Sequence, residues 1–595
     1  MSTRDPYHHL HDEDYTKPFD QNYVGANQLI NMGGRKTISL NGEWNFVLDL
    51  HDEGLRQAWY KDNEDTIENW TIPRDYDDAI WQKTEVPSCW NVQKPEWFYF
   101  EGSGWYRRDF ILNEKLDDKL YLLKIGAANY EARVFINNTY AGGHRGGSTP
   151  FFIDLSSYLH AGKNKILIQV ENRRQSNRVP MNHTDWFNYG GLYRDVDLLI
   201  LPKVHIKNFK IYLQEVSGQK YIHADVDISA SASGEATLRI NELDIVEKIK
   251  IVNGRGSVRI KASPELWEPN HPKLYATSIS FETDEVNDKI GFRTVRIAGE
   301  KILLNGKDIF LRGICVHEDD LENGKTTTEQ DIRQRFIHAK ELGCNYIRLS
   351  HYPHHERAAE IADELGLLLW EEIPVYWAIA FSNQQTYDDA ENQLCELILR
   401  DQNRASVIIW GVGNENEDTD QRLNFMSRLA QKAHSIDPTR LVSAACLINR
   451  QKFAIEDRLA EYLDVIGINE YFGWYEPSFD GLSQLLSNSS PGKPVVICET
   501  GADAKGGYTG DHKTLFSEMH QSHVLNKQFE LLLKADFIRG VTPWILYDFR
   551  TERRQNSIQQ GWNLKGLIRN DKSTKKQAFE TVKKHYRELA LKYEN

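Results

Sequence analysis

The sequence predicts three domains, two β-sandwiches followed by a (β/α)8 barrel. A chain of 595 residues is too long for one hydrophobic core and is expected to divide into about three or four domains. The first half shows short segments in which apolar and polar residues alternate. After Gly299, strand-like runs alternate with longer helical patterns. These patterns indicate sandwiches first and a barrel last.

The first domain is predicted over residues 1–202, where the alternation is punctuated by Gly, Asn and Pro. The clearest segments are Trp44–Leu48, Trp105–Phe110, Arg133–Ile136 and Lys165–Val170. Successive side chains of a strand point to opposite faces, so a period of two is typical of strands with one buried face. Several such strands at this spacing predict an antiparallel sandwich.

A second β-rich domain is predicted over residues 203–298. It contains alternating segments such as Ala236–Ile240 and Leu274–Ile279. Its length of about 95 residues is that of a small immunoglobulin-like sandwich. We therefore expect a second sandwich between the first domain and the barrel.

The third domain is predicted over residues 299–595. In the helix expected at Thr328–Leu342, Ile332, Phe336 and Ala339 recur at positions i, i+4 and i+7. The eight expected strands are Ile309–Ile314, Tyr346–Leu349, Leu367–Trp370, Val407–Val412, Leu441–Ala445, Val465–Ile468, Val495–Cys498 and Gly540–Leu546. Eight strands alternating with helices are typical of a (β/α)8 barrel, with a doubly wound sheet as the alternative.

Composition and motifs exclude several classes of protein. A net charge of -14 argues against nucleic acid or an anionic membrane as the partner, and no run of 18 apolar residues predicts a membrane span. The six cysteines are scattered without a CxxC pair, and no HExxH, Walker or Gly-rich phosphate motif is found. The first 20 residues show no apolar segment of a signal peptide. We therefore expect a soluble cytoplasmic protein with free thiols and without a metal or cofactor.

Two of the expected barrel strands end in a carboxylate. Glu415 follows Trp410–Asn414, and Glu499 follows Val495–Cys498. Barrel enzymes carry their catalytic groups at the carboxyl ends of the strands. Cleavage of a glycosidic bond needs two carboxyls, one to protonate the leaving oxygen and one to attack or stabilise the anomeric carbon. One glutamate after a strand is about as often an exposed surface group, whereas two at strand ends favour this chemistry.

Several strings, in order along the chain, resemble glycoside hydrolase family 2, the family of β-galactosidases, β-glucuronidases and β-mannosidases. They are Gly291–Arg296, His317–Asp319, Arg348–Pro353, the Asn414-Glu415 pair and the strand that ends at Glu499. The resemblance covers nearly the whole chain and implies a jelly-roll-like sugar-binding sandwich, an immunoglobulin-like sandwich and a catalytic TIM barrel. It also implies a retaining mechanism with a covalent glycosyl-enzyme intermediate.

In this resemblance Glu415 matches the acid/base and Glu499 the nucleophile. A nucleophile must be ionised, so Glu499 is expected among hydrogen-bond donors and positive charge. An acid must keep its proton near neutral pH, so Glu415 needs apolar or like-charged surroundings that raise its pKa.

The resemblance implies further contacts near the two glutamates. Asn414 is placed to bond the sugar 2-OH, and Tyr471 resembles the tyrosine that bonds the nucleophile. Further candidates for substrate binding are His317, His351, Asn469, Tyr475 and Trp544. Glu417 is expected at the surface of a loop, and Glu371-Glu372 are expected to support the site. For the aromatic residues the alternative is packing of the barrel rim.

Two further segments bear on the identity of the sugar. The segment 185–194 resembles the one in glucuronidases, in which Asp185 would contact the sugar 3- or 4-OH. Asn563 and Lys565 form an Asn-x-Lys pattern that binds the substrate carboxylate in glucuronidases. An ammonium and an amide donor can distinguish a carboxylate from CH2OH by charge-assisted hydrogen bonds.

Departures from the glucuronidase pattern leave the sugar open. Gln559 stands four residues before Asn563, where an arginine is usual, and Asn416 stands where a proline is common. Asn-x-Lys-Gly strings also occur in family members that are not glucuronidases. The sequence does not tell whether one of the nearby arginines reaches the sugar instead; these are Arg550, Arg553 and Arg554.

We expect an exo-acting β-D-glucuronidase acting on a glycoside or oligosaccharide. The alternative is a β-D-galactosidase or another neutral-sugar β-glycosidase. A non-catalytic carbohydrate-binding protein is more distant, because Glu415 and Glu499 are both present. A homo-oligomer is expected, and the aglycone, the number of subunits and any ion dependence stay open.

Overall fold

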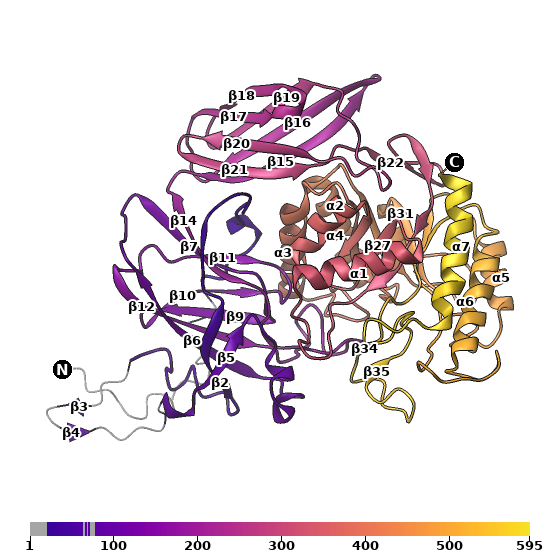
Figure 1. The fold of residues 1–595 in the computed structure, drawn as a ribbon, viewed down its shortest axis with the longest axis horizontal. Helices are drawn as coiled ribbons and strands as arrows, with labels where there is room; N and C mark the ends of the chain where they lie inside the picture. Colours follow the sequence, from indigo (N-terminus) through magenta and orange to yellow (C-terminus); the bar gives the residue numbers. More distant parts are fainter. Residues whose placement is uncertain are drawn as a thin grey trace.

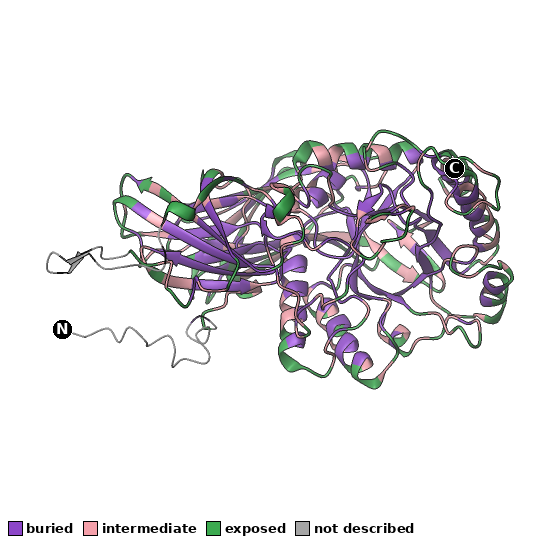
Figure 2. Ribbon diagram, turned by 90° about the horizontal axis from the view of Figure 1, so that it is seen from below, coloured by how far each residue is buried: buried purple, intermediate pink, exposed green. Residues whose placement is uncertain are grey.

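The computed structural model describes residue 19, residues 21–62, 66–67, 70–71 and 76, and residues 78–594. The prediction that the first 20 residues contain no signal peptide falls outside the described part, apart from Phe19. Figure 1 shows the first sandwich beside the barrel, with the second sandwich lying across one side of both. Buried residues fill the interior of the first sandwich and of the barrel in Figure 2.

Two antiparallel sheets pack face to face in the first domain, in the strand orders β10-β9-β12-β6-β2-β5 and β1-β14-β7-β11. Trp44 and Tyr106 of the first sheet share a buried core with Leu123 and Leu198 of the second. The strands are β1 (Thr37–Ser39), β2 (Gly42–Asp49), β5 (Gln82–Val86), β6 (Ser103–Leu112), β7 (Lys119–Ile125), β9 (Glu131–Ile136), β10 (Thr139–Arg145), β11 (Phe151–Asp154), β12 (Gly162–Glu171) and β14 (Val196–Pro202). Short pieces are β3 (Thr66–Ile67), β4 (Trp70–Thr71), β8 (Ala128–Asn129), β13 (Gly191–Leu192) and the 3-10 helices Ala26–Gln28, Asp78–Ile80, Trp90–Val92 and Pro95–Trp97.

The second domain is a smaller sandwich with the strand orders β15-β16-β19 and β18-β17-β20-β21. Ile222, Leu238 and Ile279 belong to the core between its sheets. Its elements are β15 (Ile206–Val216), β16 (Gln219–Ile228), β17 (Gly234–Ile240), a 3-10 helix (Asn241–Leu243), β18 (Ile245–Ile251), β19 (Arg255–Lys261), β20 (Tyr275–Phe281) and β21 (Asp284–Ile290).

Parallel strands form the barrel, in the order β25-β33-β32-β31-β30-β29-β28-β27-β26. The two end pieces, β25 and β26, are consecutive parts of the first strand, so their pairing with β33 and β27 closes the sheet. The strands are β25 (Leu311–Arg312), β26 (Cys315–Val316), β27 (Tyr346–Leu349), β28 (Leu368–Glu372), β29 (Val407–Asn414), β30 (Leu441–Cys446), β31 (Val465–Asn469), β32 (Val495–Glu499) and β33 (Ile538–Val541). A small sheet of β22 (Val295–Ala298), β23 (Lys301–Leu304) and β24 (Lys307–Ile309) precedes them, and β34 (Phe549–Arg550) pairs with β35 (Trp562–Asn563) after them.

Helices cover the outside of the barrel (Figure 1). The first, α1, spans Glu329–Leu342, and the periodicity of Ile332 and Phe336 predicts this helix. Thr328 caps it by accepting a bond from Asp331 N. The others are α2 (Glu356–Leu365), α3 (Gln384–Asp401), α4 (Asp420–Ile436), α5 (Asp480–Asn488), α6 (Glu518–Leu532), α7 (Gln577–Tyr593) and a 3-10 helix (Arg458–Tyr462) between β30 and β31. In the described residues none of the helices is long and apolar enough to span a membrane.

Two predicted barrel strands are wrong in their bounds. The run Ile309–Ile314 is not one strand, because β24 ends at Ile309 and β25 and β26 are separated at Gly313. The run Gly540–Leu546 ends as a strand at Val541, since Pro543 has no N–H to donate and Trp544 N bonds Thr500 O instead. Apart from the half-buried Ile309, both runs are buried, so their apolar pattern indicates burial and not the pairing of the backbone.

Polar contacts hold the first domain on the mouth of the barrel. Arg194 donates to Glu318 over 2.9 Å and to the carbonyl of Pro353 over 3.0 Å. Tyr189 OH donates to Asp319 Oδ1 over 2.6 Å. These contacts fix the segment that begins at Asp185 against the ends of the barrel strands.

Candidate active site

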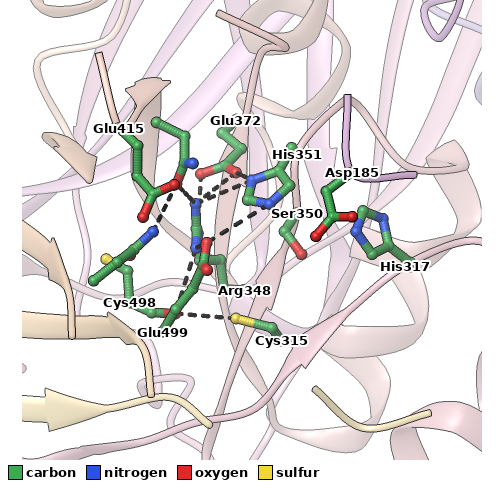
Figure 3. Close-up of polar contacts among 12 residues, drawn as sticks. Asp185, Cys315, His317, Arg348, Ser350, His351, Glu372, Glu415, Cys498 and Glu499 are labelled. Carbon is green, nitrogen blue, oxygen red and sulfur yellow. Dashed lines mark hydrogen bonds and ion pairs between the residues drawn. The ribbon is translucent and has the colours of Figure 1, made fainter. Parts of the chain in front are cut away.

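Glu499 is the last residue of β32, and donors surround its carboxylate (Figure 3). Arg348 Nη1 donates to Oε1 over 2.9 Å, and Tyr471 OH donates to Oε2 over 2.7 Å. His351 Nε2 lies 3.6 Å from Oε1. A cation and a hydroxyl donor favour the charged form of a carboxylate, which is the surrounding expected for a nucleophile.

Arg348 is the central cation of the site. It is fully buried in β27, and besides Glu499 it bonds Glu372 over 2.9 Å and Asn414 Oδ1 over 2.8 Å. Burial opposes its charge, but Glu372 and other acidic groups, Glu499 among them, raise the pKa of Arg348 well above its usual range. The guanidinium therefore joins side chains from β32, β28 and β29 into one network.

Glu372 supports this network at the end of β28. Burial opposes its charge, but Arg348 and a hydrogen bond with His351 hold its pKa below the usual value. Trp370 Nε1 donates to Glu372 Oε2 over 2.7 Å, and His351 Nδ1 lies 2.8 Å from Oε1. The side chain orients Arg348 and His351 beside Glu499.

Glu415 has a different environment, although it follows the end of β29 directly. Its backbone is left-handed, with φ 52, and Trp377 Nε1 donates to Oε2 over 2.8 Å. Burial and then the charge of Glu499 raise the pKa of Glu415 to about 7, against the lowering effect of the bonds from Trp377 and Asn469. Near neutral pH this carboxyl keeps its proton for part of the time.

The two glutamates can therefore act as an acid and a charged partner on one substrate. Glu499 raises the pKa of Glu415 through space, so the two carboxyls lie within electrostatic reach of each other. Environments that separate the protonation states of two carboxyls define an acid and a base. We call Glu415, Glu499, Arg348, His351 and Glu372 the glutamate cluster.

Amide groups beside the glutamates have spare bonding capacity. Asn469 Nδ2 donates to Asn414 Oδ1 over 3.3 Å. Asn414 Nδ2 and Asn469 Oδ1 are buried and have no partner among the described residues. Buried polar atoms are normally paired, so these two are suited to bonding a polyhydroxylated ligand.

An aromatic wall lies next to the same network. Trp544 stacks on His351 with ring centroids 4.9 Å apart, and it meets His317 edge-on at 5.1 Å. Burial and then the neighbouring His351 hold the pKa of His317 well below its usual value, so its ring is neutral. His317 Nδ1 lies 3.1 Å from Tyr352 OH, while Nε2 is buried without a partner in the described chain. Neutral rings of this kind suit the faces of a sugar.

A second polar group forms where the first domain meets the barrel. Asp185 accepts bonds from Thr551 Oγ1 at 2.9 Å and from Arg554 Nη2 at 2.5 Å. Asn563 Nδ2 lies 3.4 Å from the same carboxylate. Asp185 belongs to the first domain, whereas its three donors belong to the last part of the barrel.

Lys565 is buried beside this aspartate, and an acid already neutralises it. Lys565 Nζ bonds Asp503 Oδ2 over 2.6 Å and Tyr475 OH over 2.9 Å. Gln559 Nε2 donates to the other oxygen of Asp503 over 2.8 Å. Burial opposes the charge of Lys565, but Asp503 and Tyr475 keep its pKa above the usual value. We call Asp185, Arg554, Asn563, Lys565 and Asp503 the domain-junction cluster.

All the candidate site residues predicted from the sequence lie in or beside these two clusters, and their roles stay predictions. The sequence does not single out Arg348, Trp377 or Asp503, and it leaves Arg554 as one of three arginines that it cannot place. The string that contains Arg348 was noticed, and its position one residue before the end of a strand was a usable signal. Glu417 is exposed, as expected. Glu371 is buried, and unlike Glu372 it has no bond to Arg348 or His351 in the described residues; it lies toward Asp401 and Arg400.

No group of three or more His, Cys, Asp or Glu side chains in the described residues has the geometry to hold a metal ion. The six cysteines are free, and five of them are buried.

Three family profiles match successive parts of the chain. The profile "Glycosyl hydrolases family 2, sugar binding domain" matches residues 37–202. "Glycosyl hydrolases family 2" matches residues 204–293, and "Glycosyl hydrolases family 2, TIM barrel domain" matches residues 295–591.

Individual relatives cover most of the chain at moderate identity. A protein of Bacteroides fragilis named β-glucuronidase is 28% identical and aligns with 92% of this chain and 81% of its own length. The β-glucuronidase of Ruminococcus gnavus in complex with D-glucuronic acid is 25% identical, with a TM-score of 0.82 over 94% of this chain and 99% of that chain. A GH2 β-galacturonidase of Eisenbergiella tayi bound to galacturonate is 25% identical, with a TM-score of 0.80 over 93% of this chain and 97% of that chain.

Proposed function

The chain belongs to glycoside hydrolase family 2 and is a glycoside hydrolase, and from this premise we propose that it is a retaining, exo-acting β-D-glucuronidase. The observation that carries the reaction type is the pair Glu415 and Glu499, one with a pKa raised to about 7 and the other bonded by a cation and a hydroxyl. Retaining enzymes use a pair with these properties.

In the first step Glu499 attacks the anomeric carbon while Glu415 gives its proton to the oxygen of the leaving group. The bond to the aglycone breaks as the bond between the sugar and a Glu499 oxygen forms. In the second step Glu415, now ionised, takes a proton from water, and the water oxygen displaces Glu499. The anomeric configuration is retained because inversion occurs twice.

The neighbouring residues serve these steps. Arg348 and Tyr471 orient the carboxylate of Glu499 by hydrogen bonds. These bonds weaken as the negative charge of Glu499 moves into the new bond to the sugar. The free Nδ2 of Asn414 is suited to the sugar 2-OH, a contact that strengthens in the transition state. Trp544, His351 and His317 would pack on the sugar ring.

The domain-junction cluster supports a uronate as the sugar. Lys565 and Asn563 are both 1% exposed and lie at one edge of the site, where an ammonium and an amide can bond a carboxylate. Relatives over most of the chain carry the name β-glucuronidase, including the Bacteroides fragilis protein. One of the solved neighbours was bound to glucuronic acid.

Two observations support other sugars. The Eisenbergiella tayi neighbour acts on a galacturonide, which differs from a glucuronide only at C4, the position that Asp185 is expected to contact. The bond between Lys565 and Asp503 neutralises the ammonium, which suits a neutral sugar better than a free lysine would. A β-galacturonidase and a neutral-sugar β-glycosidase are therefore the second candidates.

A panel of 4-nitrophenyl β-glycosides, compared by kcat/KM, tests the proposal. The glucuronide is expected to be the best substrate, ahead of the galacturonide, galactoside and glucoside. If the galacturonide were hydrolysed faster than the glucuronide, the protein would be a galacturonidase and still a uronidase. If the galactoside or the glucoside were hydrolysed fastest, the assignment as a uronidase would be refuted. If the purified protein hydrolysed none of these substrates, this result would contradict the proposed glycosidase activity.

Three finer predictions belong to the same proposal: a homo-oligomer, a cytoplasmic location and a jelly-roll topology of the first sandwich. Size-exclusion chromatography with light scattering tests the first, and cell fractionation tests the second.

A further inference from the structure

We propose that Arg554 determines the choice of sugar, because it supplies a second positive charge to the carboxylate of a bound uronate, next to Lys565. This inference rests on the proposed function and adds to it a residue from the segment between β34 and β35.

Arg554 is held beside the residues that are proposed to bind the sugar. Its Nη2 bonds Asp185 Oδ2 over 2.5 Å, and Asn563 Nδ2 reaches the same oxygen at 3.4 Å. Thr551 Oγ1 bonds the other oxygen, Oδ1, over 2.9 Å. Arg554 and Asn563, one half of the Asn-x-Lys pattern, therefore converge on one carboxylate.

Arg554 also lies within electrostatic reach of Lys565. Burial opposes the charge of Arg554, but nearby acidic groups raise its pKa above the usual range; they are Asp185, Tyr475 and Asp503. Tyr475 and Asp503 are the two hydrogen-bond partners of Lys565 Nζ. The charge of Arg554 in turn opposes that of Lys565. The two cations thus flank one small region.

Much of the bonding capacity of Arg554 is unused. An arginine has five N–H donors, and among the described residues one of them reaches an acceptor, Asp185. Its Nε is buried and has no partner in that part of the chain. A buried donor without an acceptor costs free energy unless a ligand or water completes the site. The guanidinium is therefore ready to bond an incoming anion.

The pairing of charges in the cluster shows why Lys565 alone does not offer a free positive charge to a uronate. Lys565 is already neutralised by Asp503, and Arg554 by Asp185, so the empty cluster has no net charge from these four groups. In a uronate the carboxylate is attached to the carbon next to the one that carries the 4-OH. When Asp185 accepts the bond of the 4-OH, its hold on Arg554 weakens, and Arg554 turns its free donors to the neighbouring carboxylate. A sugar with CH2OH at that position offers no such anion.

The other arginines of the segment are directed elsewhere. Arg550 Nη1 donates to Tyr189 OH and to the carbonyl of Asp320, both over 2.9 Å. The Arg553 guanidinium lies 4.3 Å from the ring centroid of Trp377, the residue that bonds Glu415. Arg554 alone of the three bonds a member of the domain-junction cluster in the described structure.

The test compares wild type with Arg554→Gln on 4-nitrophenyl β-D-glucuronide and β-D-glucoside. Loss of a charge-assisted contact should lower kcat/KM on the glucuronide by about 10- to 150-fold. The glucoside should lose much less than the glucuronide, because it offers no carboxylate to Arg554, and Thr551 and Asn563 still orient Asp185. Arg569→Gln, which removes an exposed arginine four residues after Lys565, is the charge-matched control and should change neither value.

The glucuronide-to-glucoside ratio separates the possible results. Equal losses on both substrates would reduce Arg554 to a structural partner of Asp185 and overturn the inference. A wild type that prefers the glucuronide, with the same ratio in Arg554→Gln, would overturn the role of Arg554 and leave the proposed function intact. A wild type that prefers the glucoside would overturn both.

A second variant protects the test against misfolding. Arg554→Lys keeps the charge and its pairing with Asp185 but loses the planar, multiple donors. It should retain part of the preference for the glucuronide, and free glucuronate should inhibit it more strongly than it inhibits Arg554→Gln. Equal inhibition of the two variants by glucuronate would contradict a charge contact.

Discussion

The glutamate cluster and the domain-junction cluster handle buried charge in opposite ways. In the glutamate cluster one cation, Arg348, bonds two carboxylates, and its members lie at or next to the ends of barrel strands. The domain-junction cluster is made of two separate ion pairs, Arg554 with Asp185 and Lys565 with Asp503. Its members come from loops, a short strand and two domains.

This difference fits the proposal that the reaction and the choice of sugar depend on different parts of the molecule. Strand ends are rigid, so the glutamate cluster can hold a nucleophile and an acid at fixed positions. Loops tolerate substitution without loss of the fold, so the residues of the domain-junction cluster can differ between enzymes that act on different sugars. Changes in the first cluster should affect all substrates, and changes in the second should affect the ratio between substrates.

The largest effect is expected from Glu499→Gln. No nucleophile remains, so release of nitrophenol from every substrate should fall by about 10⁴-fold or more. Glu417→Gln is the matched control, since Glu417 is exposed on the loop after β29, and it should have normal activity. If Glu499→Gln lost activity on one sugar only, the proposed division of roles between the two clusters would be wrong.

Glu415→Ala should follow, with a loss of about 10²- to 10⁴-fold for substrates whose leaving group needs a proton. Aryl glycosides with good leaving groups should still complete the first step, and azide should then speed the second and give a β-glycosyl azide. Rescue of Glu499→Ala by azide with the same anomer would mean that the two roles are exchanged. The carboxyl groups of Glu415 and Glu499 should lie about 5–5.5 Å apart in a complex with substrate, and a separation of roughly 8 Å or more would mean inversion or a wrong assignment of one residue.

Lys565→Ala tests the other cluster and should have a smaller effect that depends on the sugar. It removes a charge-assisted contact to the uronate, so kcat/KM on the glucuronide should fall by about 10- to several-hundred-fold. It also leaves Asp503 unpaired, which repels a uronate further. Activity on the galactoside or glucoside should fall much less, and equal losses would demote Lys565 to a structural residue.

The smallest effect is expected from Trp377→Phe, and it appears in the pH profile. Glu415 must be protonated to act as the acid, so with a pKa of about 7 the value of kcat/KM should decline above neutral pH. Trp377 Nε1 stabilises the ionised form, and its removal should raise the pKa of Glu415. The alkaline limb should then move up by about one pH unit, equally for the glucuronide and the glucoside. A downward movement of this limb would contradict the assignment of Glu415.

The glutamate cluster could be predicted from sequence to a large extent. Glu415 and Glu499 each come at the end of a run of mainly apolar and small residues, which marks a buried parallel strand and its end. The predicted strand Leu367–Trp370 ends before Glu372, whereas in the structure Glu372 is the last residue of β28. Strand bounds failed at Ile309–Ile314 and at Gly540–Leu546, because apolar patterns do not show where backbone pairing changes.

The domain-junction cluster could be predicted only through single residues. The resemblance indicates Asp185, Asn563 and Lys565, but not Asp503, and it leaves Arg554 open beside Arg550 and Arg553. Asp185 and Arg554 are 369 positions apart, and no periodic pattern connects them. Which of three arginines in one loop turns toward a distant aspartate depends on how two domains dock, and local sequence does not encode that.

The origin of Asp185 in the first domain has a consequence for recombination and protein engineering. The barrel carries the glutamate cluster, but a carboxylate from the N-terminal sandwich completes the edge of the site. If Asp185 contacts the sugar as proposed, a chimera that exchanges this sandwich for one from a relative would keep the glutamate cluster and change that sugar contact. Such an exchange would also have to preserve the contact between Arg194 of the sandwich and Glu318 of the barrel, which holds the two domains together.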